Sequence, residues 1–357
     1  MRVVAGIVGV ALIALMLSEF FVAFLLPRRV RRDPRIARNL YRVLWRPWRA
    51  IASGRKPSTA DTMLGVFGPL ALILQLVTWT IGLLFGYALL EWAVASGSFA
   101  GRVFSSSGLF LSAGAADGGY GLRAVDLLEA ATGVGVLFIV IGYMPSVYGA
   151  FSRREIAVSQ FAPRAGSPPA AGALLRNVFG RQQWRELERE LRAWEEWAAE
   201  LMETQLSYPV LGYYRSQHVN QNWLAALTAM VDVAAFVKAT APEGKVVAAD
   251  VTYAIGRHAL ADLALQHRVE RRPSDGRLAD GEFDALYAIA DDATDDAVDR
   301  EEARRRLDAL RATYEPNAQA LARYFAVELP AWFPPDDAAS VRQPRVGVGG
   351  DRDDLVG

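Results

Sequence analysis

The sequence predicts an all-α membrane protein with three transmembrane helices, a re-entrant pore loop between the second and third, and a helical cytoplasmic C-terminal domain. Large apolar residues concentrate within the first 150 of its 357 residues. A dense basic block follows the first apolar run, and helical periodicity continues through the second half. The chain has no cysteine, which excludes disulfides, thiolate metal sites and cysteine nucleophiles.

The first apolar run, from Val3 to Leu26, is long enough to span a bilayer, because a spanning helix needs about 20 apolar residues. Only Ser18 and Glu19 interrupt it. No small-residue cleavage site precedes Pro27, so the run is expected to be an uncleaved anchor rather than a signal peptide. An acid within a span is a candidate functional residue. Alternatively, Glu19 pairs with a basic residue just beyond the run.

A strongly basic segment follows this anchor. From Pro27 to Lys56 there are ten arginines and one lysine against one aspartate, a net charge of +10. Basic residues beside a span are retained in the cytoplasm, which predicts an external N-terminus. Arginines alternate with aromatic and aliphatic residues from Arg35 to Ala52, as in helices that lie on an anionic membrane surface. We expect Arg28–Lys56 to bind anionic lipid headgroups. Nucleic acid could use the same residues, but the position between two spans favours the membrane.

Two further apolar runs, Met63–Val94 and Leu122–Phe151, are predicted to be the second and third spans. Two arginines after the third span return the chain to the cytoplasm. Between the spans, Phe99–Leu111 is too short and too polar to cross a membrane, yet too apolar for an ordinary external loop. Such segments are often re-entrant. In the second span, Gly82 and Gly86 form a GxxxG motif, which predicts close helix packing.

An ordered set of short segments runs from the third span into the second half of the chain. These segments are Asp126–Ala130 (DLLEA), Gly133–Gly135 (GVG), Val140–Pro145 (VIGYMP), Tyr148–Glu155 (YGAFSRRE), Arg164–Pro169 (RAGSPP), Ser207–Val210 (SYPV) and Arg215–His218 (RSQH). Together they resemble a bacterial group of two-span, pore-loop membrane proteins that is similar to the potassium-channel pore domain and carries an extra N-terminal span. The resemblance implies a homotetrameric cation channel in the bacterial inner (cytoplasmic) membrane, with a cytoplasmic C-terminus. Potassium would be the permeant ion, and no other cofactor is implied.

The resemblance also places a selectivity filter, which in this group reads threonine, any residue, glycine, aromatic, glycine, aspartate. Ala115 replaces the aromatic residue and Ala116 replaces the second glycine, so potassium selectivity is in doubt. A protein that no longer conducts, and acts as a membrane scaffold or sensor, is therefore the alternative function. A literal Gly119-Tyr120-Gly121 follows, but it has no threonine ahead of it and is interpreted as a glycine-rich turn. The six filter positions are Ser112, Ala113, Gly114, Ala115, Ala116 and Asp117.

The third span contains residues with two interpretations each. Its glycines and proline either pack against neighbouring helices or form a hinge that lets an inner helix bend and gate. Its first acids, Asp126 and Glu129, either attract cations to an outer mouth or simply favour a helix N-terminus. The hinge candidates are Gly133, Gly135, Gly142 and Pro145.

The second half of the chain is predicted to be helical and to lack enzymatic machinery. No paired catalytic carboxylates, nucleophile elbow, phosphate loop or metal motif is present. Helices are expected at about 182–206, 222–238, 244–268, 280–290 and 295–325. The first has a seam that would fit a coiled coil or packing within the chain, and the second reads as a buried core helix. The acidic run Asp291–Asp299 reads as a solvated helix start, with divalent-cation regulation as the alternative. The predicted domains are the anchor (1–27), the basic segment (28–61), the pore-like unit (62–152), a linker (153–180), the helical cytoplasmic domain (181–335) and a disordered tail (336–357).

Overall fold

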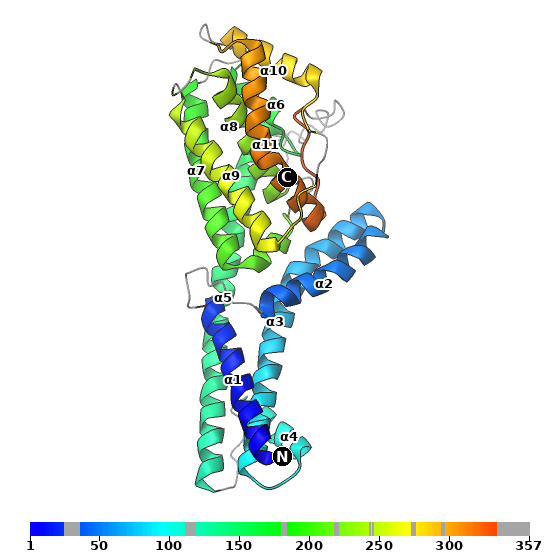
Figure 1. The fold of residues 1–357 in the computed structure, drawn as a ribbon, viewed down its shortest axis with the longest axis vertical. Helices are drawn as coiled ribbons and strands as arrows, with labels where there is room; N and C mark the ends of the chain where they lie inside the picture. The colour runs from blue at the N-terminus through cyan, green and yellow to red at the C-terminus, as the bar shows by residue number, and fades with distance from the viewer. Residues whose placement is uncertain are drawn as a thin grey trace, which may run out of the picture. The chain divides into compact units, whose positions relative to one another are not determined.

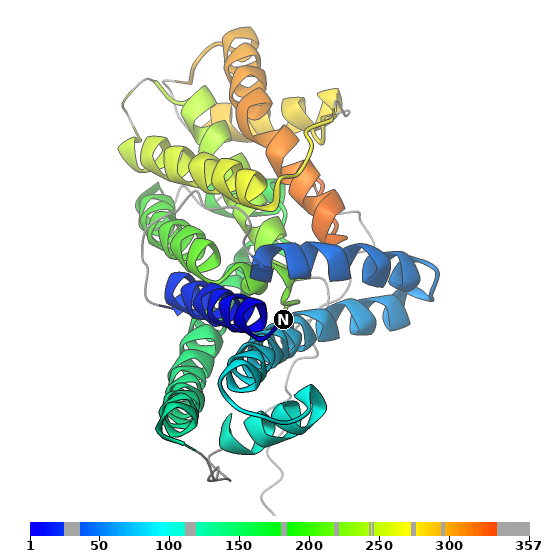
Figure 2. The same cartoon turned by 60° about the horizontal axis from the view of Figure 1, so that its bottom comes forward.

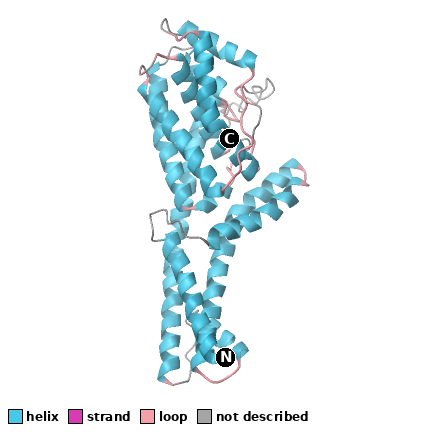
Figure 3. Ribbon diagram, in the orientation of Figure 1, coloured by secondary structure: helices cyan, strands magenta, loops and turns pink. Residues whose placement is uncertain are grey.

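The protein is helical throughout the part of the chain that its structure, a computed structural model, describes. No strand occurs among these residues (Figure 3). This confirms the all-α prediction. The disordered tail predicted at 336–357 lies outside the described part of the chain. The described residues are 1–24, 36–110, 119–179, 184–217, 221–242, 244, 246–272, 276–293 and 297–333.

The chain divides into two compact units, each formed from two stretches of sequence. The first unit combines Met1–Ile156 with Glu200–Gln217, and the second combines Ala157–Ala199 with His218–Gly357. Helices α5 and α7 therefore each begin in one unit and end in the other. The first unit contains α1 (Arg2–Phe24), α2 (Ile36–Ser53), α3 (Pro57–Val94), α4 (Phe99–Phe110), most of α5 (Tyr120–Ala165), the end of α7 (Trp184–Ser207) and the 3-10 helix η1 (Pro209–Tyr213). The second contains the rest of α5 and α7 with α6 (Ala171–Phe179), α8 (Trp223–Thr240), α9 (Val247–His267), α10 (Asp280–Ala293) and α11 (Arg300–Phe325).

Four described helices, α1, α3, α5 and α8, are long and apolar enough to cross a membrane. The first three present exposed apolar side chains, including Val10, Ile73 and Phe138, which is 69% exposed. Contiguous exposed apolar surface of this kind marks a membrane or partner contact. In α8, by contrast, 94% of the apolar window is buried inside the protein, so the predicted core helix is confirmed. The first unit therefore carries the membrane-length apolar surface.

Small residues allow α1 and α3 to pack closely side by side (Figures 1 and 2). A Cβ at Gly86 would lie 2.7 Å from the Ile13 side chain, and one at Gly82 would lie 2.6 Å from the Met16 sulfur. From α1, a Cβ at Gly9 would lie 2.7 Å from the Gly86 carbonyl oxygen. These contacts run in opposite sequence directions, so the helices are antiparallel. The predicted packing role of the GxxxG motif is confirmed.

The amphipathic helix predicted from Arg35 to Ala52 is α2, which folds back on the start of α3 as a hairpin (Figure 1). Its buried Trp45 ring packs edge-on against Phe67 of α3, with centroids 4.8 Å apart. Trp48 donates from Nε1 to the Met63 carbonyl at 2.9 Å. The first backbone N–H of α2, at Ile36, donates to the carboxylate of Glu19 at 3.0 Å. Glu19 thus satisfies a helix N-terminus, a backbone partner that the sequence did not suggest.

The segment 200–217 returns to the first unit, where a buried arginine binds its backbone. Arg154, on α5, donates to the carbonyls of Leu211 at 2.7 Å and Tyr214 at 2.9 Å. Its side chain is 3% exposed, and Glu155 balances its charge at 2.9 Å. The predicted cytoplasmic domain at 181–335 is therefore wrong in one respect, because this part of it belongs with the apolar helices.

The predicted linker at 153–180 is also wrong over much of its length. Helix α5 continues 14 residues beyond the predicted end of the third span, as far as Ala165. No helix-breaking glycine interrupts residues 152–165, and the helix ends where Gly166 adopts a φ of +86°, a conformation that favours glycine. A second helix, α6, then begins at Ala171.

In the second unit, α8 forms the core and α6, α9 and α11 pack around it. Its one acid, Asp232, is 1% exposed and receives two bonds from Arg277, at 2.6 and 2.9 Å. Tyr314 of α11 donates a third bond at 2.6 Å. The coiled-coil seam predicted in α7 is buried within the chain at Leu187, Leu191, Trp194, Ala198 and Leu201. This favours packing within the chain over a coiled coil.

Candidate pore unit and its buried carboxyl groups

The segment predicted to be re-entrant begins with a 12-residue helix, α4, that lies beside α3 (Figure 1). At its start, the Phe99 ring packs against Trp92 of α3, with centroids 6.0 Å apart. In its third turn, the buried Ser106 lies 3.1 Å from the Leu84 carbonyl of α3 and bonds to Glu129 of α5. Its last residue, Phe110, belongs to an apolar core that also contains residues of α1, α3 and α5. Helix α4 is therefore held on two sides.

Helix α4 closely approaches α5 at Gly133. A Cβ at this position would lie 2.1 Å from the carbonyl oxygen of Phe110, so no residue larger than glycine fits without movement. Gly133 lies 13 residues beyond Tyr120, the first residue of α5, which is about 20 Å along the helix axis. The C-terminal end of α4 thus lies well down the length of α5.

Three carboxyl groups gather beside α4. Glu91 and Glu129 are 0% exposed and Asp126 is 7% exposed. Their charges act on one another, and Arg102 of α4 is the positive group that acts on Glu91 and Asp126. Both oxygens of Asp126 lack a hydrogen-bond partner in the described residues, while the carboxyl groups of Glu91 and Glu129 are close neighbours. We call Glu91, Asp126 and Glu129 the acid cluster.

The acid cluster changes the interpretation of Asp126 and Glu129. The sequence suggested either cation-attracting acids at an outer mouth or acids in the first turn of a helix. Neither residue lies in the first turn of α5, and both are buried within the chain. The Ser106 hydroxyl has one proton, so it can donate to only one of its two partners, the Leu84 carbonyl and Glu129. Both hydrogen bonds can form at once when Glu129 carries a proton: Glu129 then donates to the Ser106 hydroxyl, and Ser106 donates to the Leu84 carbonyl. Ionisable groups in apolar helices are candidate functional residues by default.

Sequence reasoning missed Glu91. It lies one turn before the end of α3, where an acid reads as the boundary of a span. The packing of α3 against α5 brings it to the two acids of α5, as the contact between Tyr87 and Thr132 at 2.7 Å shows one turn earlier. The sequence did contain an indication, because Glu91 is an acid within the apolar run Met63–Val94. The same feature identified Glu19 as a candidate functional residue.

The hinge candidates differ in their surroundings. Gly133 packs against α4, whereas a Cβ at Gly135 or Gly142 would meet nothing within 4 Å. Pro145 is exposed and lies within the continuous helix α5. Because proline has no N–H, it cannot bond to the carbonyl one turn earlier. Ser146 donates from its hydroxyl to the Gly142 carbonyl at 3.1 Å beside this point. Gly135, Gly142 and Pro145 therefore stay candidates for a hinge, and Gly133 is a packing residue.

The filter positions Ser112–Asp117 lie outside the described residues. The tripeptide Gly119–Gly121 is described, and α5 begins at Tyr120, whose side chain is 93% exposed. A helical start is not the extended backbone that turns successive carbonyls toward an ion, which favours the turn interpretation. Within the described part of the acidic run, Asp299 caps α11 by accepting from the backbone N–H groups of Glu301 and Glu302.

No group of three or more histidine, aspartate or glutamate side chains among the described residues is arranged to hold a metal ion. Comparisons of the chain with protein-family models, with curated proteins and with solved structures find no match.

Proposed function

We propose that α3, α4 and α5 form the pore unit of a homotetrameric cation channel, with Ser112–Asp117 as its filter and potassium as its permeant ion. The observation that carries the proposal is the path of α4. It starts near the end of α3, and its last residue meets Gly133 about 20 Å along α5. A bilayer core is about 30 Å thick, so a helix that descends this far and is followed directly by the filter positions suits a re-entrant pore segment.

The electrostatics of α4 support the same proposal. The C-terminal end of a helix carries a partial negative charge of about half an elementary charge. In α4 this end is Phe110, which lies in an apolar core. Electrostatic interactions are strong in such surroundings because water is excluded. Four such ends around a symmetry axis would stabilise a cation between them. Four copies are needed because each chain supplies one pore unit.

We further propose that α2 binds anionic lipid headgroups, which would orient the first unit with the basic segment in the cytoplasm. The face of α2 that contains Trp45 is buried against α3, while Val43 is 67% exposed and Ile51 is 53% exposed. Arg46, Arg55 and Lys56 are exposed nearby. Apolar side chains beside exposed cations suit the boundary between headgroups and acyl chains. A reporter fused after Gly54 should read cytoplasmic, and a periplasmic reading would overturn this orientation.

Ion flux into liposomes tests conduction directly. The purified protein should transport K⁺, Rb⁺ or Na⁺ down a gradient at a rate above that of empty liposomes. Native mass spectrometry in mild detergent should show a four-chain species. A monomer that persists in every detergent would remove the channel proposal. A tetramer without flux would instead favour the scaffold or sensor alternative.

The double variant Ala115→Tyr with Ala116→Gly tests the filter assignment. Glycine at 116 would remove the cost of a left-handed alanine, about 1–2 kcal/mol per chain, and tyrosine would restore packing behind the carbonyls. The variant should gain K⁺-over-Na⁺ selectivity, measured as a reversal potential in planar bilayers. An unchanged current–voltage relation in a correctly assembled tetramer would contradict the assignment of these residues as the filter.

A further inference from the structure

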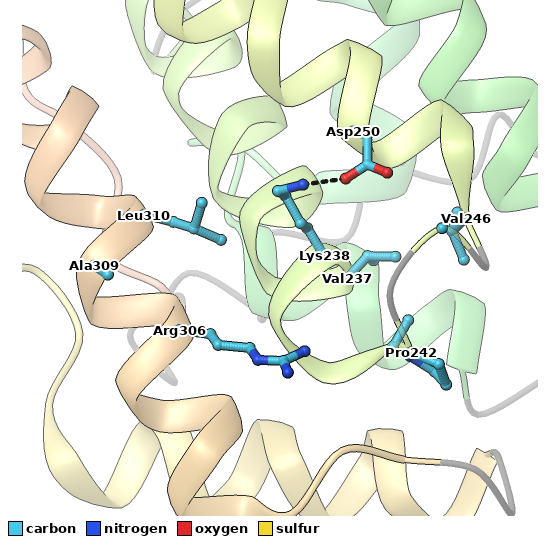
Figure 4. Close-up of a pocket in the computed structure, with 10 residues that line it drawn as sticks. Val237, Lys238, Pro242, Val246, Asp250, Arg306, Ala309 and Leu310 are labelled. Carbon is cyan, nitrogen blue, oxygen red and sulfur yellow. Dashed lines mark hydrogen bonds and ion pairs between the residues drawn. The ribbon is translucent and has the colours of Figure 1, made fainter.

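The second unit contains a cavity of about 420 Å³ between the end of α8, the start of α9 and one face of α11 (Figure 4). Its size lies within the range of small-molecule sites, roughly 300–1,000 Å³. Most of its wall is apolar, and the residues that provide that wall are Val237, Ala241, Pro242, Val246, Ala309 and Leu310.

Two cations line this cavity, and their partners differ. Lys238 forms an ion pair with Asp250, which also lines the cavity. Arg306 uses Nε to donate to Glu302 at 2.7 Å, and Glu302 also pairs with Arg305 at 2.7 Å. In the described part of the chain, Glu302 is the only acceptor that bonds to Arg306. The terminal guanidinium nitrogens of Arg306 point into the space opposite Pro242 (Figure 4).

Among the described residues that line the cavity, Lys238 and Arg306 each carry a positive charge and Asp250 carries a negative one. The described lining therefore has a net charge of one positive unit. The start of α9 adds to this positive potential, because Val246 precedes the helix and no side chain caps it, and a helix N-terminus is partially positive. A site with one excess positive charge suits a monoanion better than a phosphate ester with two or more charges.

We infer that this cavity binds a small organic monocarboxylate, with its carboxylate on the terminal nitrogens of Arg306 and its apolar body against the apolar wall. A guanidinium presents two parallel N–H groups that match the two oxygens of a carboxylate. Lys238 also lines the cavity, where its ion pair with Asp250 limits its contribution. The site involves no residue of the proposed pore, so it is a binding function separate from conduction.

Benzoate is the probe for this site, and benzamide is its neutral counterpart of nearly the same shape. Isothermal titration of the full-length protein in detergent should show saturable benzoate binding, and benzamide should bind at least about tenfold more weakly because it lacks the charge. Acetate should also bind more weakly, because it leaves the apolar wall uncovered.

Single substitutions then locate the site. Arg306→Gln should weaken benzoate binding about tenfold or more, since it removes the charged pair of donors. Asp250→Asn should tighten binding, because it frees Lys238 from its competitor. Arg192→Gln is the matched control: Arg192 pairs with Glu188 four residues earlier, as Arg306 pairs with Glu302, but it does not line the cavity. Binding to this control should be unchanged.

Absence of saturable benzoate binding in the millimolar range would overturn the inference, as would equal binding of benzoate and benzamide. Equal affinity in Arg306→Gln and Arg192→Gln would also overturn it, because binding would then lie elsewhere. Ala309→Phe provides a second, steric test, since it should fill the cavity and abolish binding while leaving every charge in place. Thermal unfolding of each variant shows whether it is folded, and ion flux plays no part in any of these readouts.

Discussion

Replacing Gly133 with alanine should displace the C-terminal end of α4. The added Cβ would lie 2.1 Å from the Phe110 carbonyl oxygen and 3.0 Å from its carbonyl carbon, whereas ordinary contact begins at 3.4 Å. The backbones of α4 and α5 would therefore have to separate by about 1.3 Å at this point, because neither atom belongs to a flexible side chain.

The cost of this separation can be set against the helix propensity of alanine. Overpacking of a well-packed core costs about 1–3 kcal/mol, while alanine is favoured over glycine within a helix by up to about 1 kcal/mol. The net result is a loss of about 0–2 kcal/mol for Gly133→Ala, with the upper end expected because the contact is with backbone atoms. Gly135→Ala is the matched control on the same helix, because a Cβ there meets nothing within 4 Å. It should be neutral or stabilising by up to about 1 kcal/mol.

Hydrogen exchange measured by mass spectrometry distinguishes these outcomes. In Gly133→Ala, the amides of Ser106–Phe110 should exchange faster, because the end of α4 has lost its close contact, while those of α8 should be unchanged. Gly135→Ala should match the parent protein in both regions. Equal exchange across α4 in the two variants would refute the packing role of Gly133. A uniform increase that includes α8 would indicate general destabilisation instead.

Three further substitutions test other parts of the structure. Arg277→Ala leaves Asp232 buried without its cation and should cost about 3–5 kcal/mol of unfolding free energy. Burial raises the pKa of Asp232, so the folded variant takes up a proton at this residue on acidification. The loss of unfolding free energy, measured by urea denaturation, should therefore be smaller at about pH 5 than at about pH 8. Glu129→Gln keeps a donor for Ser106 and should unfold at the parent's temperature, whereas Glu129→Ala should lose about 1–3 kcal/mol; equal melting of the two would refute the bond. Arg154→Met leaves two buried carbonyls unpaired, so limited proteolysis should cut the segment 200–217 faster, and an unchanged rate would show that other contacts hold it.

Local sequence patterns predicted those elements whose environment is set by their own residues. Helix α2 has aromatic residues on one face and arginines on another, which fixes its amphipathic character without reference to a partner. Helix α8 is apolar on all sides but short, and it was correctly expected to be a core helix. The prediction ended the third span at Phe151 because two arginines follow it, whereas the helix itself continues past these arginines to Ala165.

Contacts between distant residues could not be predicted in the same way. Arg154 reads as a basic residue at the end of a span, and nothing near it in the sequence indicates that it binds carbonyls about 60 residues later. Glu91 joins Asp126 and Glu129 only because α3 packs against α5, two helices that are separate in the sequence. The cavity beside Arg306 is likewise formed by α8, α9, α11 and the loop between α8 and α9 together, and each helix contributes only one to three side chains.

The chain passes from the first unit to the second after Ile156, back after Ala199, and across again after Gln217. A protein truncated to residues 181–335 would therefore lack the end of α5 and all of α6, which packs against α8 and α10, and would retain the segment 200–217 without its partners. The second unit cannot be removed, expressed alone or exchanged with another protein by a single cut. Proteins that share this architecture are thus expected to inherit both units together, and any insertion that preserves folding should fall within a loop rather than at a boundary between the units.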